Sequence, residues 1–250
     1  MLDDLTSVTT LAIPGALLLL VMLWAGVRRG ARELHLAPER RATLLRATGA
    51  LLGGWLVLAF WLGARGVYQG ASGSMLPGLL LGLAVVLPIV IGLTLAAASR
   101  TVRDILAVTP PHLLIGVQLY RLLGVVFLVL LAQERIPAEF ANPAGWGDVV
   151  VGASAPIVAA LYYRDAARWH GLAVFWSLFG LADLVVAVTM GVLTAPGDLQ
   201  RLAFDRPNAL VATFPLVLVP TVLVPISILL HLLTLRRLRS EPGKRELAPA

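Results

Sequence analysis

Residues 171–193 read GLAVFWSLFGLADLVVAVTMGVL, a stretch in which Asp183 is the only charged residue. A membrane-spanning helix needs about 20 mostly apolar residues, so this stretch is long enough to cross a lipid bilayer. The rest of the chain is built in the same way, because 58% of the 250 residues are hydrophobic and 14% are charged. Soluble domains carry about 25% charged residues. The composition therefore excludes a single water-soluble globular domain and predicts an integral membrane protein.

Six further stretches have a similar length and apolarity, so the sequence predicts an all-α bundle of seven transmembrane helices. We expect residues 1–235 to form a single transmembrane domain. The polar, proline-containing residues 236–250 are expected to form a disordered cytoplasmic tail. The predicted spans are approximately residues 8–27, 44–63, 76–99, 113–132, 146–163, 171–193 and 209–235.

Basic residues are concentrated in alternate loops, which is the pattern that cytoplasmic loops of membrane proteins show. One set of loops, together with the tail, holds 14 arginine and lysine residues, whereas the other set holds 4. This asymmetry predicts an N-terminus outside and a cytoplasmic C-terminus. Compact loops and an Arg-, Ala-, Leu- and Gly-rich composition suggest a bacterial inner membrane. The 14 residues are Arg28, Arg29, Arg32, Arg40, Arg41, Arg100, Arg103, Arg164, Arg168, Arg236, Arg237, Arg239, Lys244 and Arg245.

Composition also excludes several kinds of chemistry. The chain has no cysteine, which removes disulfides, thiol nucleophiles and cysteine metal sites. Its only lysine, Lys244, lies in the polar tail, so a Schiff base to retinal within the membrane is excluded. The net charge of +6 comes from short loops between apolar stretches, so no nucleic-acid partner is expected. The expected partners are membrane lipid and a small molecule or ion.

Asp183 is the clearest candidate functional residue, because it lies about 18 Å into its span and close to the middle of the bilayer. An ionisable side chain at that depth is costly and marks a candidate for function. The sequence leaves two interpretations open: a proton, cation or substrate contact, or a structural role, either in an ion pair or as a neutral aspartic acid bonded to a backbone carbonyl. The helical stripe that contains Asp183 is directed at other helices, because its other members are mostly small: Trp176, Gly180, Ala187 and Gly191.

Arg121 is the one basic residue well inside a span, and Gln118 shares its helical face. One interpretation is an ion pair with Asp183, because the two residues differ in depth by only about 6 Å. The other interpretation, which the direction of the helix favours, is that the side chain extends to the inner headgroups. An ion pair would keep Asp183 ionised and make it a poor proton carrier.

Asp148 falls in the first turn of the fifth predicted span, where we interpret it as an acceptor for free backbone N–H groups. The surrounding sequence GWGDVVVG is similar to GLADLVVAV around Asp183. The two predicted helices run in opposite directions, so the similarity is at most a weak inverted repeat of the kind found in transporters. The alternative is that so short a similarity arose by chance.

The seventh span contains Pro215, Pro220 and Pro225, each of which removes a backbone donor and frees a carbonyl. Transporters build substrate and cation sites from such broken helices, and Thr221 and Ser227 lie near enough to contribute. The alternative is a helix that is simply kinked.

All four histidines map to the predicted cytoplasmic side, with His231 about one turn from the end of its span. A metal or haem site at His112, His170 and His231 lacks any HxxxH or HExxH spacing, so no cofactor and no metal site is predicted. The pairs Gly49/Gly53 and Gly78/Gly82 predict close helix packing within the bundle.

We expect a small-solute or ion transport, permeation or binding protein that uses Asp183 and the proline-broken seventh helix. One alternative is a non-catalytic seven-helix sensor, ligand-binding or accessory protein. A membrane-embedded lipid-modifying enzyme is the second alternative, disfavoured because no paired acid/base constellation and no catalytic residue stands out. The residues of the predicted pathway are Asp183, Arg121, Gln118, Asp148, Thr221 and Ser227.

Overall fold

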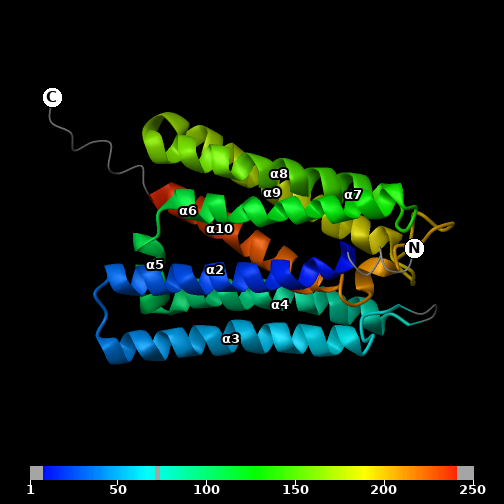
Figure 1. The fold of residues 1–250 in the computed structure, drawn as a ribbon, viewed down its shortest axis with the longest axis horizontal. Helices are drawn as coiled ribbons and strands as arrows, with labels where there is room; N and C mark the ends of the chain where they lie inside the picture. Colours follow the sequence, from blue (N-terminus) through cyan, green and yellow to red (C-terminus); the bar gives the residue numbers. More distant parts are fainter. Residues whose placement is uncertain (1–7, 71–73, 241–250) are drawn as a thin grey trace.

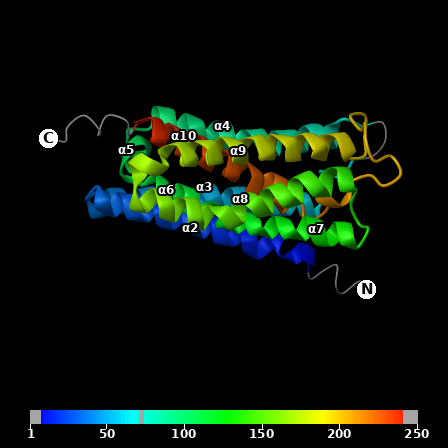
Figure 2. The same ribbon diagram turned by 90° about the horizontal axis from the view of Figure 1, so that it is seen from above.

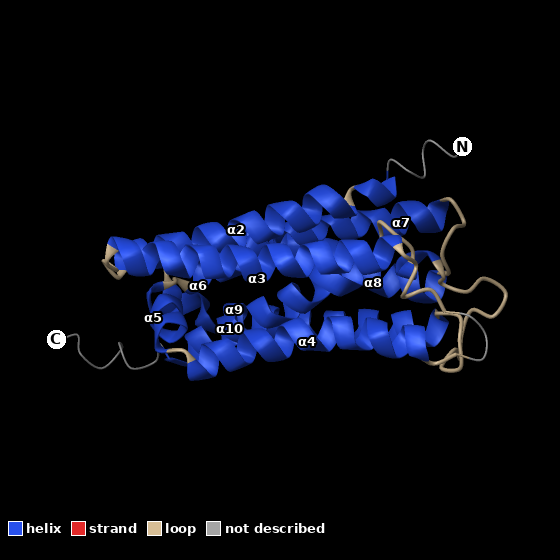
Figure 3. Cartoon of the chain, turned by 90° about the horizontal axis from the view of Figure 1, so that it is seen from below, coloured by secondary structure: helices blue, strands red, loops and turns tan. Residues whose placement is uncertain are grey.

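The computed structural model describes residues 8–70 and 74–240, and this part of the chain consists of helices, turns and loops without a strand (Figures 1 and 3). Seven helices in the described part are long and apolar enough to cross a membrane, which confirms the predicted number of candidate spans and supports a multi-pass membrane protein. These spans are Val8–Glu33, Pro38–Ala64, Leu76–Ala98, Pro111–Ala132, Ala138–Arg164, Ala166–Thr194 and Val219–Ser240.

Several spans are built from more than one helical element. The fourth span has a 3-10 segment between two α-helices, and the seventh begins with a π-helix. The elements are α2 (Ala12–Glu33), α3 (Pro38–Ala64), α4 (Leu76–Ala98), α5 (Arg100–Val108), α6 (Pro111–Val117), η1 (Gln118–Gly124), α7 (Val125–Ala132), α8 (Ala138–Arg164), α9 (Ala166–Thr194), η2 (Leu210–Ala212), η3 (Val219–Leu223) and α10 (Val224–Ser240).

The long helices run side by side along one axis, with the start of α2 and the end of α10 at opposite ends of the bundle (Figures 1 and 2). Helix α8 packs against α9, η1, α6 and α7, whereas α10 packs against α9, α4 and α6. A second packing region joins α2 to the seventh span through buried residues such as Leu19, Leu223 and Leu230. Helix α3 lies at the periphery and contacts the rest mainly through α2.

Helix α8 begins at Ala138, well before the predicted start of the fifth span at residue 146. The intervening sequence is rich in small residues rather than strongly apolar ones, so its hydropathy is low. Those small residues pack closely on α7. Ala144 is buried in a cluster with Phe127. A Cβ added to Gly145 would lie 2.6 Å from Cδ2 of Leu128.

The seventh span also differs from the prediction at both ends. Its helix begins at Val219 instead of residue 209, because the stretch around Pro215 forms turns rather than a continuous helix. It continues to Ser240, so the first part of the predicted tail is helical. Arg236 and Arg237 donate hydrogen bonds to the carbonyls of Ala96 and Thr109 there. The remainder of the predicted tail, residues 241–250, lies outside the described residues.

The glycine pairs do not pack as expected. A Cβ at Gly53, Gly78 or Gly82 would meet nothing within 4 Å, and only Gly49 lies near another helix, at Trp24. Close helix approach occurs at other glycines, several of which lie around Arg121.

Candidate functional site

Arg121 lies on η1, the 3-10 segment in the middle of the fourth span. This segment lies very close to α8, because Gly152 leaves room for its backbone: a Cβ at Gly152 would be 2.5 Å from the amide nitrogen of Leu122. The close packing buries the arginine, whose side chain is 2% exposed. A guanidinium held inside the bundle needs polar partners from neighbouring helices, since burying an unpaired charge is very costly.

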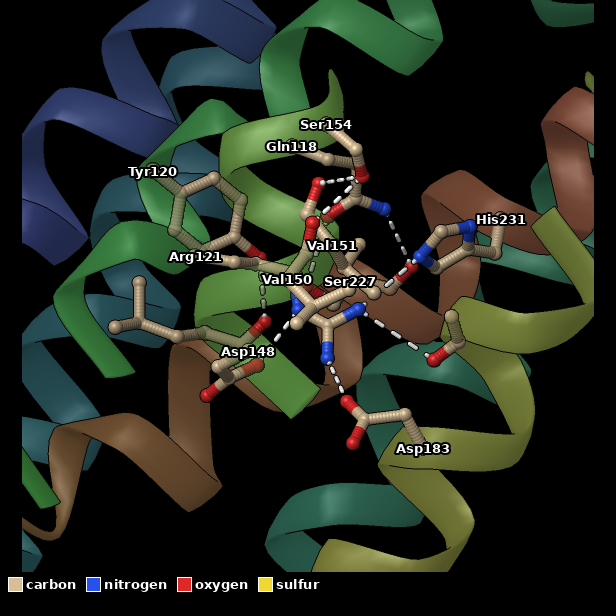
Figure 4. A network of polar contacts seen from close by, with 12 residues as sticks. Gln118, Tyr120, Arg121, Asp148, Val150, Val151, Ser154, Asp183, Ser227 and His231 are labelled. Atoms are coloured by element: carbon tan, nitrogen blue, oxygen red, sulfur yellow. Dashed lines mark hydrogen bonds and ion pairs between the residues drawn. The ribbon is translucent and has the colours of Figure 1, made fainter. Parts of the chain in front are cut away.

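Two carboxylates from different helices provide those partners (Figure 4). Nε of Arg121 donates to Oδ1 of Asp148 on α8 at 2.6 Å. Nη2 of Arg121 donates to Oδ2 of Asp183 on α9. The side chains of Asp148 and Asp183 are 16% and 8% exposed, so both ion pairs are largely shielded from the surroundings.

The third nitrogen of the guanidinium, Nη1, contacts α9 and α10. It lies 3.4 Å from the carbonyl of Gly180, to which it donates, and 3.3 Å from Nε2 of His231. Arginine has only donors, so Nε2 of His231 accepts and the imidazole is neutral with its proton on Nδ1. His231 is fully buried and its ring lies against Trp176. Its Nδ1 has no hydrogen-bond partner among the residues that the structure describes.

Glycines provide the space for this cluster. A Cβ on Gly147 would overlap the carboxylate of Asp183, and one on Gly124 would overlap the side chain of Asp148. A Cβ on Gly180 would overlap the ring of His231. Small residues let helices approach closely where larger side chains would separate them. The glycines thus allow three helices to reach one guanidinium.

A second group of polar side chains lies beside the cluster. Nε2 of Gln118 donates to the carbonyl of Ser227 at 3.2 Å, and the Ser227 hydroxyl lies 3.1 Å from Oε1 of Gln118. The hydroxyl of Tyr120 contacts the Ser227 hydroxyl and lies 3.0 Å from the carbonyl of Leu223. These contacts join η1 to the seventh span at buried positions.

The carbonyls near the prolines are already occupied. Pro225 has no N–H to offer the carbonyl of Thr221, and the indole of Trp55 donates to that oxygen instead, at 2.9 Å. The Thr221 hydroxyl donates to the carbonyl of Val217 at 2.7 Å. The hydroxyl of Tyr120 donates to the carbonyl of Leu223. Because side chains bond to these described carbonyls, they do not form the row of free carbonyls that a cation site would need.

A cavity of about 30 Å³ adjoins the cluster. A single water needs about 10–15 Å³ by this measure, so about two waters fit. Most of its wall is apolar, and the polar part consists of Tyr120, Arg121, Asp148 and Ser227.

Three of the six predicted pathway residues form the charged cluster, namely Arg121, Asp148 and Asp183. Ser227 lines the adjoining cavity, and Gln118 is bonded to Ser227. Thr221 is directed into its own helix. Of the two interpretations of Arg121, the ion pair with Asp183 is present and the extension to the headgroups is not. The interpretation of Asp148 as a helix-end acceptor is wrong, because α8 begins ten residues earlier and Asp148 pairs with Arg121.

Sequence reasoning missed His231 as part of the cluster. The sequence predicts a position about one turn from the cytoplasmic end, but α10 continues to Ser240 and His231 meets Arg121 deep in the bundle. His112 packs instead on Tyr163. Among the described residues there is no group of three or more His, Cys, Asp or Glu side chains that could hold a metal ion.

The fold and the buried cluster define a seven-helix multi-pass membrane protein with one arginine held between two aspartates. Residues 78–239 match the profile of a family described as a domain of unknown function, DUF8737. The match covers more than half of the chain, which therefore belongs to this family, and it includes Arg121, Asp148, Asp183 and His231. No curated protein and no solved structure matches the chain.

Proposed function

We propose that this protein binds and conducts an ion or another water-sized species through the bundle, at the cluster of Arg121, Asp148 and Asp183. The observation that carries the proposal is that two carboxylates share one guanidinium at buried positions beside a cavity. Ionisable residues within membrane helices are costly and typically mark ion or proton pathways. One carboxylate alone would neutralise the guanidinium, so the second exceeds what a simple ion pair requires.

The dimensions of the cavity restrict the species. A volume of about 30 Å³ holds about two waters, whereas sites for drug-sized ligands measure about 300–1,000 Å³. This supports an ion, a proton or water over a bulky organic solute.

The orientation is part of the proposal. The bundle end that holds Arg236, Arg237 and the α5 arginines Arg100 and Arg103 would face the cytoplasm, by the positive-inside rule. The N-terminus would lie outside, and the membrane would be a bacterial inner membrane. Reporter tags at the two ends should therefore label different compartments; a result in which both label the same one would contradict this orientation.

The test of function is ion flux in proteoliposomes. Asp183→Asn should abolish flux while leaving expression and folding intact. The matched control is Asp165→Asn, because Asp165 caps the exposed start of α9 and asparagine caps equally well. If wild-type protein shows no flux but retains a bound ligand, the protein is a sensor or accessory protein instead. If Asp183→Asn fails to fold and a paired Arg121→Gln restores folding, Asp183 is structural.

A further inference from the structure

We infer that the cluster binds one exchangeable proton, held on the carboxyl pair of Asp148 and Asp183. This inference rests on the proposed function, because it names the species that the proposed site binds.

The cluster contains one more acidic side chain than basic ones. Two ionised carboxylates contact one guanidinium, and the His231 ring is neutral because it accepts from Arg121. The cluster would then hold a buried net charge of −1. Buried charges without compensation are so costly that the groups neutralise instead. One proton on either carboxylate brings the cluster to zero.

No other ionisable side chain supplies the missing charge. The titratable and charged groups that face the carboxyl pair are, within the described residues, Tyr120 and Arg121 from η1 and His231 from α10. The other elements around the cavity contribute apolar residues, for example Ala12 of α2 and Phe127 of α7.

A metal cation fits the site less well than a proton. Hard cations take about six oxygen ligands, and Na⁺ sites in broken helices draw many of these from free carbonyls. The carbonyls of Thr221 and Leu223 are already bonded to Trp55 and Tyr120. The guanidinium also lies between the two carboxylates and repels a second cation.

The cavity offers room for the water that would bring the proton to Asp148. Its wall includes Asp148, Tyr120 and Ser227, and about two waters fit inside. A hydronium ion there transfers one proton to a carboxylate oxygen of Asp148 and leaves as water. The neutral carboxyl then releases its hold on Nε of Arg121, which remains paired with Asp183. Release of the proton restores both ion pairs.

Infrared spectroscopy of the purified protein in lipid nanodiscs tests this directly, because a protonated carboxyl has a carbonyl stretching band that carboxylates lack. We expect such a band at neutral pH in the wild type, shifted in D₂O and lost when the pH is raised. It should disappear in both Asp148→Asn and Asp183→Asn, because either variant balances the guanidinium with one carboxylate. Asp165→Asn should retain the band.

Absence of the band at neutral pH in the wild type would overturn the inference, and this measurement needs no variant. Loss of the band on addition of NaCl at constant pH would contradict the preference for a proton over a metal cation, because Na⁺ would then displace the proton. Flux measured in parallel separates the two proposals. A band without proton flux leaves proton binding intact and contradicts the pathway. Flux that requires Na⁺, without a band, leaves the pathway intact and contradicts proton binding.

Discussion

Asp148 and Asp183 bind two different nitrogens of the same guanidinium, that of Arg121, from two neighbouring antiparallel helices. The planar fork of arginine offers donors in several fixed directions, so one side chain can bind a carboxylate at Nε and another at Nη2. The two similar sequences around the aspartates thus converge on one cation. Together with His231, they join the fourth, fifth, sixth and seventh spans at a single point.

Loss of the cation should be the most damaging change in the cluster. Arg121→Gln leaves Asp148 and Asp183 buried without a positive partner, and breaking a buried pair in this way costs about 3–5 kcal/mol. We expect this loss in the free energy of unfolding, measured in detergent or lipid. Arg121→Lys should recover only part of it, because an ammonium cannot reproduce the fork.

The control for this prediction is the surface ion pair between Arg206 and Glu134, whose side chains are 44% and 78% exposed. Arg206→Gln should change stability by at most about 0.5 kcal/mol. Equal effects of Arg121→Gln and Arg206→Gln would contradict the importance of the buried cluster.

Much of the fold could be predicted because the bilayer imposes a simple requirement of length and apolarity on each span. Asp183 was found in the same way, since a charge in an apolar stretch stands out. Asp148 was misinterpreted because its helix begins with small residues that are buried by close packing, which hydropathy does not detect. The similarity between the two Gly-x-x-Asp sequences was the available indication that the aspartates have related roles.

Other contacts of the site could not be predicted from the sequence pattern. Trp55 bonds to Thr221, far along the chain, and only tertiary packing brings the indole to that carbonyl. His231 was placed too near the end of its span because the basic residues of α10 were assigned to a tail. These arginines are helical and extend the span by more than a turn.

Gly147 should tolerate no side chain. A Cβ there would overlap the carboxylate of Asp183, so Gly147→Ala should displace Asp183 from Arg121. We expect a loss of about 1–3 kcal/mol in stability, as for other overpacked sites, together with loss of any ion flux. The measurements are thermal unfolding and flux in proteoliposomes.

Gly53→Ala is the matched control, because a Cβ at Gly53 meets nothing within 4 Å. An alanine inside a helix is favoured over glycine by about 0.5–1 kcal/mol, so this variant should be neutral or slightly more stable. A Gly147→Ala variant that is as stable and active as Gly53→Ala would show that Asp183 can move freely.

The effects of Trp55 and Pro225 on stability should be coupled, because both act on the carbonyl of Thr221. Trp55→Phe removes the indole donor and leaves the carbonyl of Thr221 unsatisfied, at a cost of about 1–3 kcal/mol. In Pro225→Ala the backbone regains an N–H for that carbonyl. The double variant should therefore lose less than the sum of the single changes. A double-mutant cycle with a coupling energy near zero would contradict this relationship, since interacting residues show at least about 0.5 kcal/mol.

Tyr68 should make stability depend on alkaline pH. It lies between α3 and α4, outside the spans, and the residue is only 4% exposed. Burial raises the pKa of its phenol above the ordinary value. The fold favours the neutral phenol. Its contribution to stability is therefore complete below the ordinary tyrosine pKa of about 10 and is lost as the pH rises through the higher value of the folded state.

Thermal unfolding of the wild type and of Tyr68→Phe between about pH 8 and pH 11 measures this effect, because phenylalanine cannot ionise. The wild type should lose stability more steeply than Tyr68→Phe at the alkaline end. Tyr163→Phe is the control at an exposed position, where the side chain is 72% exposed, and it should follow the wild type. Parallel curves for the wild type and Tyr68→Phe would contradict this prediction, because ionisation of the Tyr68 phenol would then not lower the stability of the fold.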